Sequence, residues 1–196
     1  MPQAGLRRPP PSERRAGALD AFIDLVLETG GHPRPEAVAE RADVSIATLY
    51  RYFADLDELR RIALIRLVER FPDLFLIPNL GSGDRADRID TFVATRFALH
   101  EKLHPLQLLV RAEGHTDPAV ADHVDAARSA MAEQVDLHFD AELRTLRPSG
   151  RGDTVAGIAA LTSVESWEQY RRSLALTPAQ TRRAWSFAID RLLPSD

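Results

Sequence analysis

His100 and His104 have the spacing in this chain that most directly suggests catalysis. Residues 100–104 read His-Glu-Lys-Leu-His, a pattern that puts two zinc-binding imidazoles on one helical face, with the glutamate as general base. Pro105 follows at once. Because the residue before a proline is biased away from the helical conformation, we expect Pro105 to break that face. No third ligand follows at the spacing of the zinc metalloproteases. We therefore interpret the histidines as a surface or pocket-lining pair, and predict no catalytic residues, no metal and no cofactor.

A second group of polar side chains, in residues 45–52, could contact nucleic acid. Leu49 and Phe53 stand four residues apart, so we expect both to be buried on one face of a short helix. The polar side chains of that helix would then point outward: Thr48, Tyr50, Arg51 and Tyr52. Hydroxyl groups and an arginine on an exposed helix can meet phosphates and base edges when the helix enters the major groove of DNA.

The residues before this helix predict a helix–turn–helix. Val38, Ala39 and Ala42 would form the apolar face of a first helix, and residues 43–45 would form the turn. Ser45 is a suitable N-cap, because its hydroxyl can accept a backbone N–H of the next turn. The second helix then covers residues 46–53.

The rest of the chain also has helical patterns. Residues 1–11 are rich in Pro and Arg and predict a flexible arm, after which Ser12 would cap a first helix that ends at Gly30 and Gly31. Pro35 would begin the next helix, and Asp55 with Glu58 would begin a helix over 55–71. Further helices are expected at about 84–103, 105–113, 117–146, 152–175 and 178–193. Because no strand pattern appears, the fold class is all-α.

Residues 38–59 resemble the DNA-binding motif of the tetracycline-repressor (TetR) family of transcription regulators. The matching positions are Val38, Ala39, Ala42, Val44, Ser45, Thr48, Tyr50, Tyr52, Phe53 and Leu59. Three positions differ from the family pattern. Asp43 replaces a glycine but tolerates a left-handed turn conformation, Arg34 replaces a threonine, and Leu56 replaces a lysine that contacts phosphate.

The resemblance implies a domain organisation and partners. We expect a flexible arm over 1–11, a three-helix helix–turn–helix DNA-binding domain over 12–54, and a helical ligand-binding and dimerisation domain over 55–196, with the helix 55–71 linking the two. The partners would be a double-stranded DNA operator, a second copy of the chain and an unidentified small-molecule effector. The expected DNA-binding residues are Arg14, Arg15, Arg34, Ser45, Ile46, Ala47, Thr48, Tyr50, Arg51 and Tyr52.

Apolar residues of the larger domain suggest an effector site and a dimer interface. For a mainly apolar effector we expect a pocket lined by Phe92, Phe97, His100, Leu103, Met131 and Trp167, although aromatic side chains at helical spacing are more often plain core. Residues 154–164 carry no charge, and a helix that is apolar all round must be covered on more than one side. With the last helix, residues 178–193, this segment resembles the paired helices through which TetR-like proteins dimerise, so the expected interface residues are Ile158, Leu161, Trp185 and Ile189. The alternative is that residues 154–164 form a central core helix of a monomer.

Charge and composition limit these interpretations. The net charge is −4, and residues 1–60 contain eight Arg against ten Asp and Glu, which is unusual for a DNA-binding segment. The alternative is therefore a helical small-molecule-binding protein or enzyme with a vestigial helix–turn–helix. The chain has no cysteine and no long apolar run, so we expect a cytoplasmic protein without a membrane segment.

Overall fold

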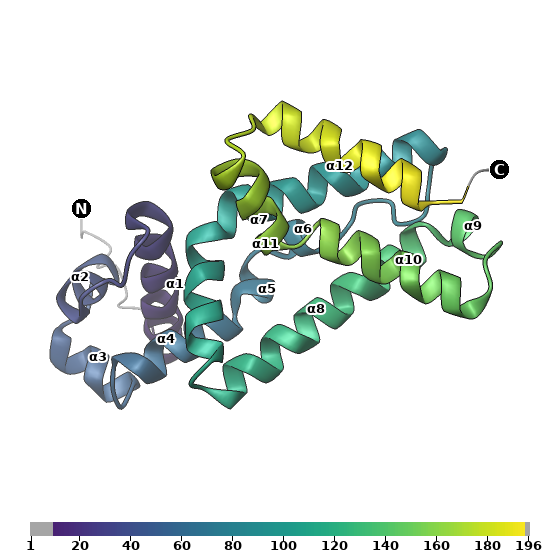
Figure 1. Cartoon of the computed structure of the whole chain (residues 1–196). Helices are drawn as coiled ribbons and strands as arrows, with labels where there is room; N and C mark the ends of the chain where they lie inside the picture. Colours follow the sequence, from purple (N-terminus) through teal and green to yellow (C-terminus); the bar gives the residue numbers. More distant parts are fainter. Residues whose placement is uncertain (1–9, 195–196) are drawn as a thin grey trace, which may run out of the picture. The chain divides into compact units, whose positions relative to one another are not determined.

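The computed structural model describes residues 10–194 of the chain, and every regular element among them is a helix (Figure 1). The all-α fold class is therefore confirmed. The chain divides into two compact units between Leu67 and Val68. The residues 1–9 of the expected arm lie outside the described part.

The first unit is built around α1, Pro11–Thr29, which contacts α2, α3 and α4. Apolar side chains of α1 are buried, namely Leu19, Phe22, Ile23 and Val26, and Gly30 ends the helix in the left-handed conformation with φ 71°. The start of α1 corrects two expectations. Proline fits the first helical position, so the helix begins at Pro11, inside the expected arm, and Pro10 takes the N-cap position expected for Ser12.

Three shorter helices complete the first unit. They are α2, Pro35–Arg41, α3, Ile46–Tyr52, and α4, Leu56–Ile65. Pro35 begins α2 as expected. The Asp55 carboxylate accepts the Glu58 N–H at 2.7 Å, while Glu58 accepts the Ala54 N–H, so the expected start of α4 is confirmed. The helix expected over 55–71 is interrupted at Arg66 and resumes as the short helix α5, Leu67–Arg70.

The second unit contains the longest helix, α7, Arg85–Gly114, which follows the short helix α6, Pro72–Phe75. We expected a break at Pro105, but α7 runs through it and His104 is helical. A proline inside a helix removes one backbone hydrogen bond. Leu103 and Leu106, on either side of Pro105, are both buried in α7, and this burial favours the continuous helix over a break.

The remaining helices are shorter than the sequence suggested. The segment 117–146 forms α8, Pro118–His138, and α9, Asp140–Leu143. The segment 152–175 forms α10, Pro148–Leu161, α11, Val164–Glu168, and a π-helical turn, Gln169–Ser173. The last helix, α12, Pro178–Leu192, begins with the expected capping box between Thr177 and Gln180.

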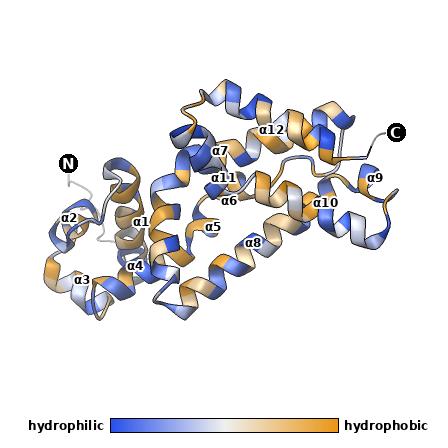
Figure 2. Cartoon of the chain, viewed as in Figure 1, coloured by the Kyte–Doolittle hydropathy of each residue, from blue (hydrophilic) through white to orange (hydrophobic). Residues whose placement is uncertain are grey.

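The core of the second unit collects side chains from α7, α8, α9, α10, α11 and α12 and from residues that flank these helices. Its buried members are Ile77, Ile89, Phe92, Val93, Phe97, Val135, Phe139, Leu143, Ile158, Trp167, Trp185, Ile189 and Leu193. Along α12 apolar and polar residues alternate with the helical period, as Figure 2 shows. Among the described residues, no helix combines the length and the apolar character needed to cross a membrane.

Candidate nucleic-acid interface

The turn between α2 and α3 depends on Asp43. Its φ is 51°, the left-handed conformation expected for this position. Three backbone hydrogen bonds close the turn: Ala42 N–H donates to Val38 O, Asp43 N–H to Glu40 O and Val44 N–H to Ala39 O, at 3.0 to 3.1 Å. Aspartate tolerates this conformation better than most residues, so the turn forms without the glycine of the family pattern.

Ser45 caps α3, as the sequence predicts. Its hydroxyl accepts the Thr48 N–H at 3.1 Å and lies 2.9 Å from the Thr48 hydroxyl. Thr48 is only 8% exposed. The expectation that Thr48 points outward is wrong. Its hydroxyl lies against the Ser45 hydroxyl and forms part of the cap of α3.

The inner face of α3 is held by the buried residues Leu49 and Phe53, as expected from their spacing. Its outer face presents Ile46 and Tyr50, which are 41% and 48% exposed, together with Ala47 and Arg51. Among the described residues Arg51 makes no ion pair, and its guanidinium lies 5.6 Å from the Tyr52 ring centre. These four side chains form a contiguous exposed surface that we call the α3 face.

Tyr52 does not belong to that exposed surface. The side chain is half-buried, and its hydroxyl is buried without a hydrogen-bond partner in the part of the chain that the structure describes. The expectation that Tyr52 points outward is therefore wrong. It lies on the edge of α3 that turns toward the interior of the first unit, and a sequence period alone does not distinguish this edge from the outer one.

The other expected DNA-binding residues are two arginines of α1 and the arginine directly before α2. Arg15 on α1 stacks over Phe53 at 5.0 Å and is half-buried, as is Arg14. Arg34 is the exposed residue before α2. By contrast, Arg41 is already paired with Glu28 at 2.7 Å, and the hydrogen bond from Arg41 lowers the pKa of the Glu28 carboxyl.

The six residues expected to line an effector pocket are mostly packed core. Phe92, Phe97 and Trp167 belong to the buried cluster of the second unit, and Leu103 is fully buried. Met131 is half-buried on α8. The arrangement favours the core interpretation for these aromatic side chains.

His100 and His104 share one face of α7, but other groups occupy their ring nitrogens. His100 Nε2 lies 2.9 Å from the Thr162 carbonyl and Nδ1 lies 3.0 Å from the Gln107 amide nitrogen, so a neutral ring donates at Nε2 and accepts at Nδ1. Burial lowers the pKa of His100. His104 meets Glu168 at 2.8 Å. Within residues 10–194 no group of three His, Cys, Asp or Glu side chains is placed to hold a metal ion.

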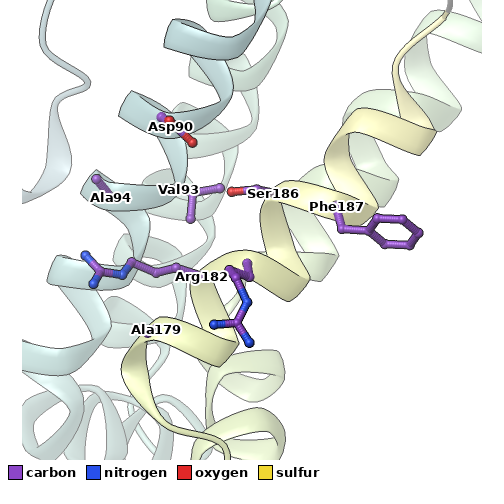
Figure 3. A pocket seen from close by; sticks show the side chains of 8 residues that line it. Asp90, Val93, Ala94, Ala179, Arg182, Ser186 and Phe187 are labelled. Carbon is purple, nitrogen blue, oxygen red and sulfur yellow. The ribbon is translucent and has the colours of Figure 1, made fainter.

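A groove between α7 and α12 was not anticipated from the sequence. Its lining residues are Asp90, Val93 and Ala94 on α7 and Ala179, Arg182, Arg183, Ser186 and Phe187 on α12. Figure 3 shows Val93 and Ser186 pointing toward each other, with Phe187 turned away from α7. None of the six expected effector-binding residues lines this groove, although the Arg182 guanidinium lies 5.6 Å from the Phe97 ring centre beneath it.

The expected dimer-interface residues are mostly inside the single chain. Ile158, Trp185 and Ile189 are fully buried in the core cluster, so they are not available to a second subunit, and Leu161 is half-buried. The correction has a simple cause. Trp185 and Phe187 are two positions apart, so they face opposite sides of α12. Because Trp185 is buried in the core, Phe187 lies on the outer side and is 66% exposed.

Comparison with solved structures defines the class of fold. A TetR-family transcriptional regulator from Streptomyces coelicolor has a TM-score of 0.73 at 22% identity, over 92% of this chain and 80% of that chain. A protein from Saccharomonospora viridis, solved in complex with choline, has a TM-score of 0.78 at 17% identity, over 94% of this chain and 100% of that chain. The fold is therefore that of the TetR-family regulators.

Sequence comparison agrees with this class. The chain is 34% identical over 123 residues to the HTH-type transcriptional repressor KstR of Mycolicibacterium smegmatis. The matched segment is 61% of this chain and 59% of KstR, so it spans less than two thirds of that relative. No family model matches the chain. The resemblance to the TetR family seen in residues 38–59 is thus confirmed by both sequence and fold.

Proposed function

We propose that this protein is a one-component transcription regulator, a repressor that binds a near-palindromic DNA operator as a homodimer and is released by a small-molecule effector. The observation that carries the proposal is the α3 face. A capped helix held by Leu49 and Phe53 presents Tyr50 and Arg51 on a helix–turn–helix scaffold. That is the arrangement by which a recognition helix reads a major groove.

In this proposal the exposed residues of α3 have distinct roles. The Tyr50 hydroxyl donates to a phosphate and positions the helix. Arg51 contacts a guanine edge, and Ile46 and Ala47 pack against thymine methyl groups. Ser45 acts through the cap. Thr48 and Tyr52 are not included, because their hydroxyl groups are turned inward.

Local charge supports DNA binding more than the total charge does. Arg15 and Arg34 supply cations in the first unit, while the cation of Arg41 is neutralised by Glu28. Only cations close to phosphates release counterions from DNA, so a balanced domain can still bind through a few placed arginines. We expect a shallow salt dependence, with few phosphate contacts per half-site.

A homodimer is supported by exposed apolar residues on two neighbouring helices. Phe187 is 66% exposed and Leu192 is 42% exposed on α12, while Ala156 and Ala160 are exposed on α10. A Cβ on Gly157 would come within 3.8 Å of Leu192, so α10 and α12 lie against each other here. Two-fold pairing of this surface would cover these side chains and place one α3 per subunit in successive major grooves.

Release by an effector requires that it bind one conformation better than the other. The effector would bind the second unit more tightly when the two recognition helices are wrongly spaced for the operator. It would then lower operator affinity by a factor no larger than the ratio of its affinities for the two conformations. The choline bound to the Saccharomonospora viridis protein supports the idea that this fold can hold a small molecule.

Fluorescence anisotropy with DNA from the promoter beside the protein's own gene tests this function. We expect saturable binding that is weakened by Tyr50→Phe and by Arg51→Ala. Arg144→Ala is a matched control, because it removes the same charge from an exposed position in the second unit. Equal losses from Arg51→Ala and Arg144→Ala would show that only net charge matters, and absence of binding by the unaltered protein would refute the proposal.

A further inference from the structure

Among residues 10–194, the buried cation Arg96 on α7 has no anionic partner. The side chain is 1% exposed. Its Nη2 donates to the Met131 carbonyl at 3.2 Å and to Gln134 Oε1 at 3.1 Å, both neutral acceptors on α8, and its guanidinium lies 5.1 Å from the Phe92 ring centre. Its Nη1 is buried and has no hydrogen-bond partner among the described residues. One end of the guanidinium is thus held in place while the other end is unoccupied.

Other arginines of the second unit are paired with carboxylates. Arg88 pairs with Glu142 and Arg111 with Glu168, and Arg151 reaches Asp136 at 2.6 Å. Burial lowers the pKa of Arg96 to about 10, so the group still carries its proton at neutral pH. An ionised group taken out of water without a counter-charge is strongly unfavourable, which makes an uncompensated Arg96 unusual for a purely structural residue.

The neighbouring ionisable rings do not supply the missing charge. His100 and His138 feel the charge of Arg96, but burial is the main cause that lowers the pKa of each, so both are neutral. His138 Nε2 donates to the Arg88 carbonyl at 2.9 Å, and its Nδ1 accepts the Gly81 N–H at 3.1 Å. Both rings therefore have their hydrogen bonds satisfied within the chain.

Among the buried side-chain atoms of residues 68–194 that lack a hydrogen-bond partner, donors outnumber acceptors, and the one acceptor is Glu142 Oε2. Outside the Arg88–Glu142 pair, the buried side-chain atoms of residues 68–194 that lack a partner are Arg96 Nη1, Trp167 Nε1 and Trp185 Nε1. All three are donors. Buried donors without partners are uncommon in folded proteins, so these three donors need an explanation.

We propose that Arg96 binds the carboxylate of an otherwise apolar effector, with Nη1 donating to a carboxylate oxygen beside Phe92 and Met131. The inference rests on the proposed function in taking the ligand as the effector. It changes the chemical class expected from the sequence, from a mainly apolar molecule to an amphipathic acid. Arginine suits this role because its fork can hold neutral acceptors at one nitrogen while the other binds the anion.

The test compares acids with their uncharged methyl esters. The fluorescence of Trp167 and Trp185 is followed while the full-length protein, without DNA, is titrated with octanoate, dodecanoate, hexadecanoate and 4-phenylbutyrate and with the methyl ester of each. We expect at least one acid to bind about tenfold or more tightly than its ester, the ratio typical of one charge-assisted hydrogen bond. Arg96→Met should reduce this ratio to about one while ester binding remains.

Arg182→Met is the matched control. Arg182 also stacks on an aromatic ring of α7, but it is exposed and lines the groove between α7 and α12. It should leave the preference for the acid unchanged. Loss of the preference in Arg182→Met but not in Arg96→Met would place the carboxylate in that groove and overturn the proposal. The proposal is also overturned if the unaltered protein prefers no acid over its ester, or if Arg96→Met keeps the preference for the acid.

Two further measurements separate the possible failures. Circular dichroism checks the fold of Arg96→Met, and Arg96→Gln, which keeps hydrogen-bonding capacity without the charge, replaces it if the fold is lost. Operator binding of Arg96→Met without ligand should equal that of the unaltered protein. A protein that prefers the acid through Arg96 but binds no DNA would refute the proposed function and leave the carboxylate site standing.

Discussion

Removing the Ser45 hydroxyl tests whether this cap organises the α3 face. Ser45→Ala leaves the Thr48 N–H without its side-chain acceptor and the Thr48 hydroxyl without its partner. Loss of an N-cap serine typically costs about 1 kcal/mol. The hydroxyl pair adds about 0.5–1.5 kcal/mol, because Thr48 is buried and water replaces the lost bond poorly. We expect the free energy of unfolding of the first unit to fall by about 2 kcal/mol.

Amide hydrogen exchange at Thr48 and Leu49 measures this loss locally, and urea unfolding measures it for the whole unit. Operator affinity should weaken by up to about thirty-fold, the equivalent of about 2 kcal/mol, because α3 must be ordered before it binds. Ser12→Ala is the control. Ser12 is not the N-cap of α1, so its loss should change stability by less than about 0.5 kcal/mol.

A double-mutant cycle gives the outcome that would refute this reasoning. Thr48→Val removes the hydroxyl and keeps the shape of the side chain. If the two hydroxyl groups stabilise each other, the losses from Ser45→Ala and Thr48→Val should not add, and the coupling should be about 0.5 kcal/mol or more. Additive losses, or a Ser45→Ala protein as stable as the Ser12→Ala control, would show that the cap does not organise α3.

Three further expectations follow from the same structure. Arg51→Ala should reduce discrimination at one base pair per half-site by about 1–3 kcal/mol, measured by anisotropy over single-base operator variants, and equal weakening at every variant would assign Arg51 to phosphate. Trp185→Ala should destabilise the second unit by about 3–5 kcal/mol in urea unfolding, whereas Phe187→Arg should halve the mass found by light scattering and keep the fold. Burial lowers the pKa of His100 and His138, so the unfolded chain binds protons first as the pH falls below about 6.5. Stability should therefore be present above that pH and be lost as the pH falls through the folded pKa values, and His100→Gln should make urea midpoints between pH 7.5 and 5 less dependent on pH.

Local signals in the sequence determined the helix–turn–helix. The positions of Leu49 and Phe53, the capping side chain of Ser45 and the left-handed Asp43 act within a few residues of each other, and each is found in the structure as expected. The same holds for the capping box at the start of α12. Such features depend on neighbours along the chain, so they can be predicted without knowledge of the tertiary fold.

Only the tertiary structure decided which side of a helix faces inward and which breaks are tolerated. A helical period shows that Trp185 and Phe187 face opposite ways, but packing against α7 and α10 decided that Trp185 is the core residue. Burial of Leu103 and Leu106 kept α7 continuous through Pro105, against the local preference. The burial of Arg96 is of the same kind. The sequence around Arg96 does not indicate that its acceptors are neutral, because the fold decides which groups of α8 lie beside it.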